Sequence, residues 1–421
     1  MMKLMKHIYL SITLASLLLS SCSSFSDAID AEKVSYISVN VKTNLLISGL
    51  TDFTNLKIEL KNYDEGLVIT KTFAQELTVD SLIPGIYDIL ISGRADDENG
   101  ESFLMSGSLA KVAILSDKKI VEMQADGVNI KPLVFSEIYY CGSKTPLNSN
   151  WFRDQFYEIY NNSLEEIYLD GLYFANLVPT ATTTTIPTWP ETDGSDYVYA
   201  DRVWKIPGNG TDYPLAPGES FVIAQFAANQ QLDIYNPTSP INCYNAEFEF
   251  NMNNANFPDQ PAADMLHVFY NGKSDIGTVP QYLTPVFGGA YVIFKVPEGE
   301  VYDPVANLGL QTKDLSGNLS KTAIYAKIPI RYVLDAVEAG RNEADIQRKR
   351  VATILDAGMT YVGNTYIGQG VARKMIGQND NGTPILQDTN NSTDDFERNV
   401  IPQFRRHGSQ MPAWNHSLQG K

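Results

Sequence analysis

The sequence is poor in histidine, cysteine and positive charge. It holds four histidines and three cysteines, and its 32 Lys and Arg residues face 49 Asp and Glu residues, for a net charge of −17. No HxxxH, CxxC or Cys/His cluster occurs, so the pattern gives no support for a zinc site. The motifs GxSxG and GxGxxG and the Walker phosphate loop are missing too. We therefore expect no catalytic residues, no metal site and no cofactor. Nucleic acid is also not expected as a partner, because its binding depends on Lys and Arg that neutralise phosphates.

Long apolar runs are also scarce, and the informative one lies at the N-terminus. Lys3 and Lys6 precede an apolar stretch from Ile8 to Leu19. A membrane-spanning helix needs about 20 apolar residues, so this stretch is too short to span comfortably. Its length and basic flank are typical of a secretory signal.

The stretch ends in Leu19-Ser20-Ser21-Cys22, which resembles the bacterial lipobox. The resemblance implies that residues 1–21 are a signal peptide, and that Cys22 becomes the lipidated N-terminus of a linker over residues 22–33. The alternative is an ordinary cleaved signal with an incidental cysteine. Acidic residues in the linker (Asp27, Asp30 and Glu32) resemble the surface-export signal of Bacteroidetes lipoproteins. We therefore expect an outer-membrane lipoprotein that faces the cell surface, with the periplasmic face as the alternative.

Two cysteines remain after Cys22. Cys141 and Cys243 fall within one predicted domain and could form a disulfide outside the cytoplasm. Two free, buried thiols are an equal alternative, because the sequence does not fix the distance between them.

A chain of 421 residues is long enough for two domains. Within residues 34–128, Ile37, Val39 and Val41 alternate with polar residues, as expected for a half-buried antiparallel strand. Short strands separated by turn residues indicate a β-sandwich. The segment LTVDSLIPGIYDILISG resembles carboxypeptidase-regulatory or prealbumin-like domains, which implies a spacer or a partner-binding module.

Residues 132–410 form the second predicted domain, followed by a tail over 411–421. The stretch QFYEIYNNSLEEIYLDGLYF, residues 155–174, predicts a β-hairpin. Together with its neighbours it resembles the lamin-tail domain, an immunoglobulin-like β-sandwich. The residues that carry this resemblance are Glu137, Ile138, Asp154, Phe156, Glu158, Ile159, Asn161, Ile167, Leu169, Asp170, Gly171 and Phe174.

The second domain is much longer than a typical lamin tail. The excess predicts long insertions at 175–212, 225–330 and 341–369, and residues 339–358 are the best helix candidate. We therefore expect a mainly all-β fold of two tandem β-sandwiches with one short helix.

Glu158 is the residue that most invites a catalytic interpretation. Glycosidases need a second carboxylate at about 5–10 Å, and Glu137 on the neighbouring predicted strand could supply it. Strand carboxylates more often accept hydrogen bonds from loops, so we expect a structural role for Glu158.

Aromatic residues on predicted loops are the candidates for ligand or partner contact. They are Trp151, Trp189, Tyr197 and Tyr199. Aromatic rings on loops can stack on sugars or become buried in a partner. The alternative for Trp189 is that it folds back onto its own sandwich.

The order of segments also resembles an uncharacterised family of Bacteroidetes outer-membrane lipoproteins. This resemblance implies a neighbourhood of starch-utilisation-type (SusC/SusD-like) transporters, each with a TonB-dependent barrel. We therefore expect a non-enzymatic surface lipoprotein that assists nutrient uptake, by binding a peptide or glycan or by docking the transporter. The alternatives are an extracellular hydrolase and an adhesive or structural surface protein.

Overall fold

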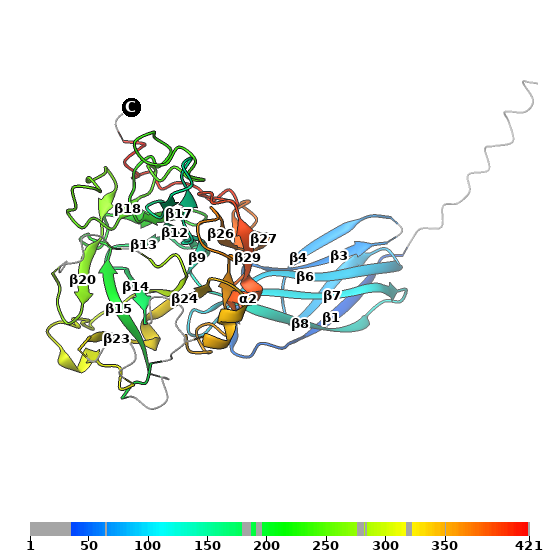
Figure 1. Ribbon diagram of the computed structural model, residues 1–421. Helices are drawn as coiled ribbons and strands as arrows, with labels where there is room; N and C mark the ends of the chain where they lie inside the picture. The colour runs from blue at the N-terminus through cyan, green and yellow to red at the C-terminus, as the bar shows by residue number, and fades with distance from the viewer. Residues whose placement is uncertain are drawn as a thin grey trace, which may run out of the picture. The chain divides into compact units, whose positions relative to one another are not determined.

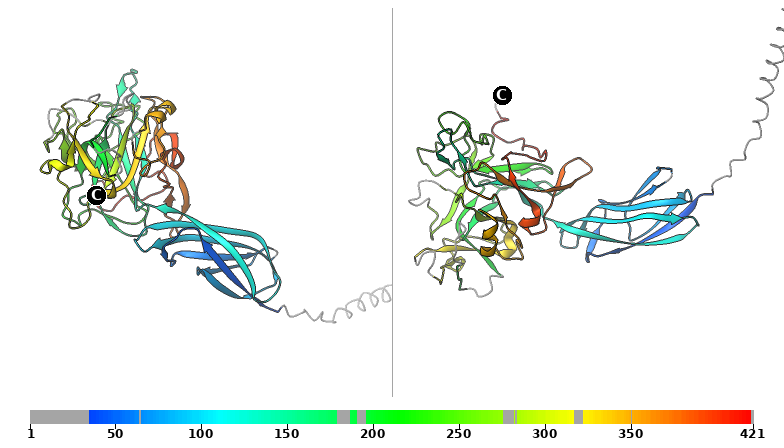
Figure 2. Two further views of the ribbon diagram at one scale, coloured as in Figure 1. Left: turned by 90° about the horizontal axis from the view of Figure 1, so that it is seen from below. Right: turned by 45° about the vertical axis from the view of Figure 1, so that its right-hand side comes forward.

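The computed structural model describes residues 35–63, 65–178, 187–190, 196–275, 282, 284–316, 322–349 and 351–419. Cys22, the signal segment and the linker lie outside these ranges. Nearly all regular elements are β-strands, which confirms the predicted all-β class. The chain divides into two compact units (Figures 1 and 2). Unit 1 comprises residues 1–48, 53–92 and 106–126, and unit 2 comprises residues 49–52, 93–105 and 127–421.

The strands that build unit 1 run in the order β4-β3-β6-β7-β8-β1-β5, with β2 paired to β6. Strands β6, β7 and β8 also contribute residues to unit 2, and β2 belongs to unit 2 entirely. Residues alternate between buried and accessible along β1 and β3, as the sequence pattern predicts. The bounds are β1 Ile37–Leu45, β2 Leu50–Asp52, β3 Leu56–Asn62, β4 Val68–Thr72, β5 Glu76–Leu82, β6 Gly85–Asp97, β7 Ser102–Ile114 and β8 Lys119–Ile130.

Unit 2 contains two large sheets. The first has the order β19-β18-β17-β12-β9-β26-β29 and the second the order β22-β23-β15-β14-β21-β24-β25, with β20 paired to β15. The first sheet consists of β9 Leu133–Tyr139, β12 Phe156–Asn161, β17 Ser220–Ala224, β18 Phe248–Glu249, β19 Ala263–Asp264, β26 Gly370–Arg373 and β29 Phe396–Val400. The second consists of β14 Tyr173–Leu177, β15 Tyr197–Lys205, β20 Leu266–Tyr270, β21 Gly289–Phe294, β22 Gln311–Thr312, β23 Tyr325–Pro329, β24 Val333–Gly340 and β25 Thr360–Tyr361.

Aromatic side chains fill the space between the two sheets. The Tyr157 ring of β12 lies 4.7 Å from the ring of Phe174 and 4.8 Å from that of Tyr291, both on the second sheet. Rings at such spacing contribute about 0.5–1.5 kcal/mol beyond their buried area. The two sheets therefore pack face to face as a β-sandwich.

Smaller elements decorate this sandwich. The paired short strands are β10 Ser143–Lys144 with β11 Asn150–Trp151, β13 Ile167–Tyr168 with β16 Pro214–Leu215, and β27 Met375–Gln378 with β28 Pro384–Leu386. The helical turns are η2 Leu308–Leu310, η3 Ile330–Tyr332, η4 Glu343–Arg348 and α2 Ser392–Asp395. Within the described residues, no helix has the length and apolar character to cross a membrane.

The predicted hairpin over residues 155–174 is wrong. Strand β12 pairs with β9 and β17, whereas β14 belongs to the other sheet. The Asn161 amide donates to the carbonyl oxygens of Glu165 and Leu215 at 2.8 and 2.9 Å. The Asp170 carboxylate accepts backbone N–H groups from the loop at 210–213. These contacts carry the chain across from one sheet to the other instead of back along β12.

The helix predicted over residues 339–358 is also wrong. Residues up to Gly340 belong to strand β24, and only the short turn η4 is helical. Asp345 is buried and its carboxylate accepts the N–H of Arg341 at 3.0 Å. Beyond the turn, the Glu338 carboxylate accepts the N–H of Val351 at 3.0 Å. A continuous helix would use the Val351 N–H internally, whereas the buried Glu338 carboxylate accepts it here.

The segments expected as insertions are partly strands of the sandwich. Strands β15, β20, β21 and β23 all lie within them, and β15 pairs with three partners of the second sheet. The apolar stretches in these segments therefore build the core rather than loops on it.

A buried arginine joins the two sheets. The Arg373 guanidinium lies 2.6 Å from Asp335 of β24 and 3.1 Å from Asp388, and its Nε donates to the carbonyl oxygen of Phe135 at 2.8 Å. Arg373 is 1% exposed. The neighbouring carboxylates raise the pKa of Arg373, and burial raises the pKa of Asp335. Because each charge has a partner, the cluster fixes how the two sheets meet.

Candidate functional site

Glu158 and Glu137 lie side by side, as expected from their strands. They are direct neighbours in the pairing of β12 with β9, and both are 1% exposed. Glu158 accepts the Ser220 hydroxyl at 2.6 Å and the backbone N–H of Arg405 at 2.9 Å. Burial raises the pKa of Glu158, and these donors oppose the rise. Both carboxylate oxygens of Glu158 are therefore engaged by protein groups.

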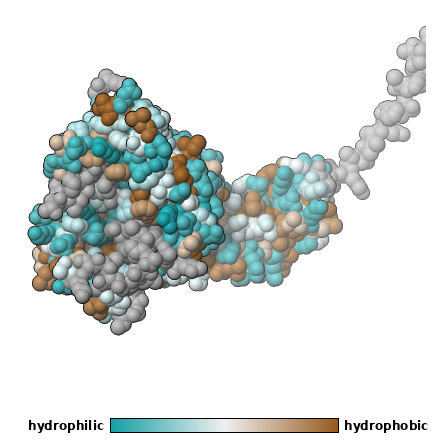
Figure 3. All heavy atoms as spheres, viewed as in Figure 1, coloured by the Kyte–Doolittle hydropathy of each residue, from teal (hydrophilic) through white to brown (hydrophobic). Residues whose placement is uncertain are grey.

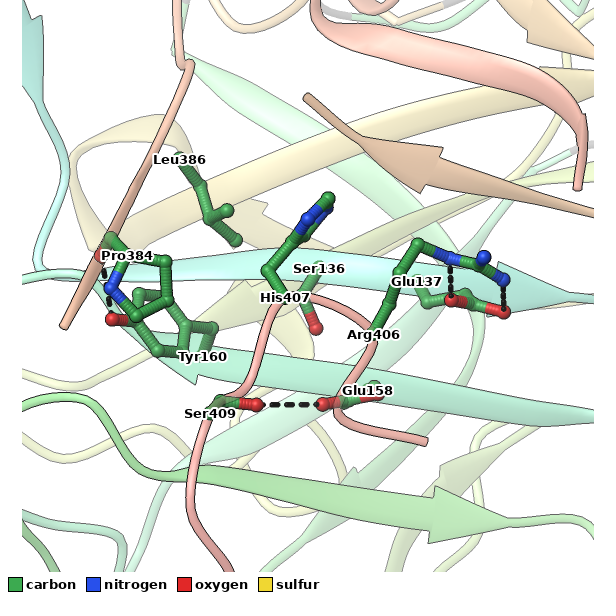
Figure 4. Close-up of a pocket in the computed structure, with 9 residues that line it drawn as sticks. All are labelled: Ser136, Glu137, Glu158, Tyr160, Pro384, Leu386, Arg406, His407 and Ser409. Atoms are coloured by element: carbon green, nitrogen blue, oxygen red, sulfur yellow. Dashed lines mark hydrogen bonds and ion pairs between the residues drawn. The ribbon is translucent and has the colours of Figure 1, made fainter. Parts of the chain in front are cut away.

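Glu137 makes a similar connection to the C-terminal segment. It accepts the N–H of Gln403 at 2.8 Å and two guanidinium bonds from Arg406, at 2.8 and 3.1 Å. Burial raises its pKa to about 7, with Arg406 opposing. Figure 4 shows Arg406 directed at Glu137 and Ser409 at Glu158.

A third carboxylate completes this arrangement. Glu247 is 2% exposed and accepts the Arg405 guanidinium at 2.6 Å, the N–H of Val222 at 2.8 Å and the Asn415 amide. Burial raises the pKa of Glu247 to about 7. We call residues 403–415 the C-terminal strap, because these three glutamates hold it against the first sheet.

The cavity beneath the C-terminal strap is very small. Its volume is about 10 Å³, and it is lined by Ser136, Glu137, Glu158, Tyr160, Pro384, Leu386, Arg406, His407 and Ser409 (Figure 4). A single water molecule needs roughly this much space. The pair Glu137–Glu158 therefore faces a strap and a water-sized hole, in keeping with the structural role expected for Glu158.

The predicted aromatic contacts separate into two groups. Trp189 stacks on Tyr199 of β15, with ring centroids 4.1 Å apart, and meets Tyr325 edge-on at 5.5 Å. Tyr199 is buried and Tyr197 lies under the Lys327 ammonium at 4.4 Å. Trp189 thus folds back onto its own sheet, which was the alternative given for it.

Trp151 lies in a different cluster. Its indole Nε1 donates to Gln230 at 3.2 Å, and the Arg153 guanidinium lies 5.0 Å from the ring centroid. Arg153 also lies 4.3 Å from the ring centroid of Phe257. Trp151 is only half-buried, but Arg153 occupies a face that a sugar ring would need.

The two cysteines are free thiols rather than a disulfide. Both are buried. The Cys141 thiol donates to the carbonyl oxygen of Gln369 at 3.0 Å, and that of Cys243 to the carbonyl oxygen of Asp154 at 3.7 Å. Burial raises the pKa of each thiol, so both stay protonated.

Over the coloured part of the face in Figure 3, apolar residues are scattered among polar ones. A hollow is a better indication of a binding site than scattered exposed residues. Unit 2 has an open recess of about 670 Å³, a volume in the usual range for ligand sites. We call it the β14–β21 recess. It is lined by Asp170, Gly171, Tyr173, Lys205, Val268, Ser274, Lys295, Val296, Glu300, Val301, Tyr302, Asp303, Val305 and Ala306.

Aromatic packing supports the floor of the β14–β21 recess. Tyr173 of β14 stacks on Phe294 of β21, with centroids 4.6 Å apart and planes inclined by 13°. Tyr302 meets both rings edge-on, at 5.6 and 5.3 Å. Tyr173 and Tyr302 are 7% and 6% exposed. A floor fixed in this way gives a ligand a preformed surface.

Charged groups of both signs surround this floor. The Lys205 ammonium lies 5.4 Å from the Tyr173 ring centroid, and Lys295 Nζ donates to the carbonyl oxygen of Tyr168 at 2.6 Å. Burial lowers the pKa of Lys295, with Asp170 opposing. Asp303 lies close enough to Tyr173 to raise its pKa, although burial is the larger cause.

The β14–β21 recess was missed by the sequence analysis. Its strand residues Tyr173, Lys205 and Val268 come from three separate strands. Its loop, at 297–306, falls in a stretch that was interpreted as an insertion. The sequence PEGEVYDP, residues 297–304, with turn residues around Val301 and Tyr302, was the available signal.

Three carboxylates also gather at the edge of the first sheet. Oxygen atoms of Glu249, Asp259 and Asp264 all lie within 4.8 Å of one another. Asn251 Nδ2 donates to Asp259 and to Asp264, at 3.2 Å each, and the N–H groups of Ala227 and Gln260 bind Glu249. The sequence analysis predicted no metal site and did not bring these residues together.

A solved structure decides the family. A crystal structure of a DUF4876 family protein from Bacteroides thetaiotaomicron is 52% identical to this chain, covers 91% of it and 100% of its own chain, and has a TM-score of 0.78. The chain belongs to the DUF4876 family. The family model, described as a protein of unknown function, matches residues 216–403. The expectation of an uncharacterised Bacteroidetes family is confirmed.

The other solved structures that resemble this chain are distant from it. A candidate adhesin from Bacteroides ovatus is 11% identical and covers 45% of this chain and 84% of its own, with a TM-score of 0.19. A candidate carbohydrate-binding protein from Bacteroides uniformis is 11% identical and covers 45% of this chain and 98% of its own, with a TM-score of 0.16. These scores are too low to support a conclusion about function. The curated proteins give no match.

Proposed function

We propose that this DUF4876 protein is a non-enzymatic lipoprotein of the cell surface that binds a nutrient, a peptide or glycan, in the β14–β21 recess. The observation that carries the proposal is the recess itself, a hollow of about 670 Å³ on a rigid aromatic floor. Ligand sites usually combine such concave, partly apolar surfaces with a few polar groups. The lipobox-like Cys22 supports the membrane anchor, and the acidic linker supports the outer face.

The proposal includes a partner. The resemblance to lipoproteins encoded beside SusC/SusD-like systems supports delivery of the ligand to a TonB-dependent transporter. Unit 1, with its prealbumin-like resemblance, would act as the spacer or docking module. The paired glutamates support no reaction here, because their oxygens are occupied by the C-terminal strap.

Ligand binding is tested with the detergent-solubilised full chain against a panel of short peptides and oligosaccharides, by isothermal titration calorimetry. The A306W variant places a large side chain in the recess at an exposed position. The matched control is A110W, which adds the same large side chain at an exposed position on β7 of unit 1, outside the recess. We expect a ligand whose affinity falls more than tenfold in A306W and is unchanged in A110W. Binding that survives A306W would remove the recess from the proposal, and turnover of a panel compound would favour a hydrolase.

The anchor is tested separately in cells. The C22A variant is expected to lose acyl labelling and to leave the membrane fraction. Protease added to intact cells should digest the wild-type protein if it faces outward. Protection in intact cells, with digestion after the outer membrane is permeabilised, would place it on the periplasmic face.

Co-purification tests the transporter partner. The wild-type protein, crosslinked at native levels, should bring down a TonB-dependent barrel. If no barrel co-purifies, the docking role is wrong, and the proposed ligand binding is unaffected.

A further inference from the structure

The charged groups of the β14–β21 recess differ in what they already bind. Glu300 has both oxygens engaged, by the Arg331 guanidinium at 2.6 Å and by the Tyr332 hydroxyl at 2.6 Å. Asp170 accepts three backbone N–H groups from the loop at 210–213, at 2.9 to 3.0 Å. These two carboxylates serve the protein itself and have little capacity left for a ligand.

Other charged groups of the recess remain available. The Lys205 ammonium contacts only the Tyr173 ring among the described residues, with no hydrogen bond or ion pair. Lys295 uses one of its three donors, on the carbonyl oxygen of Tyr168. Asp303 accepts the N–H groups of Val305 and Ala306 through Oδ1, which leaves Oδ2 without a partner in the described part of the chain.

Most of the remaining lining is apolar, apart from Ser274 and the hydroxyl groups of Tyr173 and Tyr302. Val268, Val296 and Val305 are half-buried, whereas Val301 is 84% exposed at the rim. Such a surface favours aliphatic groups and offers few of the hydrogen bonds that sugar hydroxyls need. The recess thus combines two ammonium groups and one free carboxylate oxygen with a set of aliphatic side chains.

We propose that the β14–β21 recess recognises a short peptide with free ends, by its carboxylate at Lys205 and Lys295, its ammonium at Asp303, and an aliphatic side chain against the valines. This inference rests on the proposed binding function and selects the peptide from the two ligand classes. Opposite charges on one ligand match opposite charges on the recess, so both ends of a zwitterion gain electrostatic attraction. A neutral glycan gains no such attraction at either end.

Four trileucine probes test this pairing: with free ends, with an acetylated N-terminus, with an amidated C-terminus, and with both caps. Maltotriose and a uronic acid trisaccharide serve as the glycan probes. We expect the free tripeptide to bind best, and each cap to weaken binding by about two- to fivefold, as partly exposed charge pairs do. Binding should also weaken as salt is raised, because screening reduces these attractions.

Variants assign each end of the peptide to its residue. K205Q should weaken binding of the free and acetylated tripeptides about two- to fivefold, and leave the amidated one unchanged. D303N should do the reverse, weakening the amidated tripeptide and leaving the acetylated one unchanged. The matched control is K111Q, because the Lys111 ammonium lies 5.5 Å from the Tyr63 ring centroid in unit 1, much as Lys205 does over Tyr173. K111Q should change nothing.

The outcomes separate the inference from the function on which it rests. Equal binding of capped and free tripeptides, or equal losses from K205Q on all of them, would overturn the zwitterion assignment. If either glycan binds more tightly than the free tripeptide and this binding is lost in A306W, the peptide is not the ligand but the recess remains the ligand site. If neither peptides nor glycans bind, the proposed binding function itself fails.

Discussion

Strands in the two units bury their side chains in different ways. Along β1 and β3 of unit 1, buried residues alternate with accessible ones. Along β9 and β12 of unit 2, every residue is buried, Glu137 and Glu158 included. The outer face of the first sheet of unit 2 is covered by segments that are distant in sequence. Polar side chains on its strands bind these segments. On these four strands, a charged residue is accessible in unit 1 and is a buried attachment point in unit 2.

This difference has an energetic consequence. An exposed ion pair contributes about 0–1 kcal/mol, whereas removal of one partner from a buried pair costs about 3–5 kcal/mol. The chain also provides a way to measure the two units apart. All four tryptophans, at positions 151, 189, 204 and 414, belong to unit 2. Tryptophan fluorescence thus reports unfolding of unit 2, and far-UV circular dichroism reports both units.

The largest effect is expected from R373M. The substitution leaves Asp335, Asp388 and Asp395 buried without their cation. We expect a loss of about 3–5 kcal/mol in the unfolding free energy of unit 2, seen as a lower urea midpoint by tryptophan fluorescence. A loss below about 1 kcal/mol, as for a surface pair, would show that buried charge pairs do not stabilise unit 2 more than exposed pairs stabilise unit 1.

The next effect is a dependence on pH. Burial raises the pKa of Glu249 to about 7 and that of Asp154 to about 6. The folded state therefore holds these protons more tightly than the unfolded state, so stability is lost as pH rises through about 5 to 7. The lowered pKa of Asp170 acts below this range and does not offset the loss.

We expect the unfolding free energy of unit 2, measured by urea denaturation, to fall between pH 5 and pH 8, with about 3 kcal/mol of the loss due to Glu249. E249Q should remove the share of Glu249 from this dependence, since its side chain does not titrate, whereas Glu137, Glu247 and Asp154, whose pKa values are also raised, keep theirs. The E122Q variant, at an exposed position on β8, should leave it unchanged. A midpoint that rises with pH would contradict the assignment.

A smaller loss is expected from E158Q. The amide keeps one acceptor oxygen, but its NH2 group replaces the second carboxylate oxygen and faces a donor, either the Ser220 hydroxyl or the Arg405 N–H. We expect unit 2 to lose about 1–3 kcal/mol and the C-terminal strap to exchange its amide hydrogens faster. An unchanged midpoint with loss of a defined enzymatic activity would instead make Glu158 catalytic.

The smallest effect is expected in unit 1, from K42M. Lys42 pairs with Glu76 at 3.2 Å, and these side chains are 41% and 69% exposed. Loss of the pair should change the unfolding free energy by about 0–1 kcal/mol, measured by circular dichroism. A change as large as that in R373M would remove the contrast between the units.

The sequence pattern was sufficient where one face of a strand meets water. Ile37, Val39 and Val41 lie buried in β1 as the alternation predicts. Successive residues of β12 also point to opposite faces, so Tyr157 packs toward the second sheet and Glu158 toward the C-terminal strap. What could not be predicted is which distant segment covers each face. The partners of Glu137 and Glu158, at 403–406, lie some 250 residues away.

The recess and the crossing from β12 to β14 share this difficulty. The turn residues after Asn161 suit a hairpin, and only the contacts of Asn161 and Asp170 to residues 210–215 carry the chain to the other sheet. Tyr173, Lys205 and Lys295 likewise become neighbours only through the pairing of β14 with β15 and β21. Local periodicity contains no record of such pairings.

The C-terminal strap sets an order on how the protein can assemble. Ribosomes make the chain from its N-terminus, and Arg406 emerges 269 residues after Glu137. Until then the first sheet of unit 2 has glutamates on its outer face with no cations to meet them. Completion of this unit must wait for residues 403–415, whereas the strands of unit 1 have emerged long before. A chain truncated before residue 403 should therefore fold its first unit and leave its second unit open and protease-sensitive.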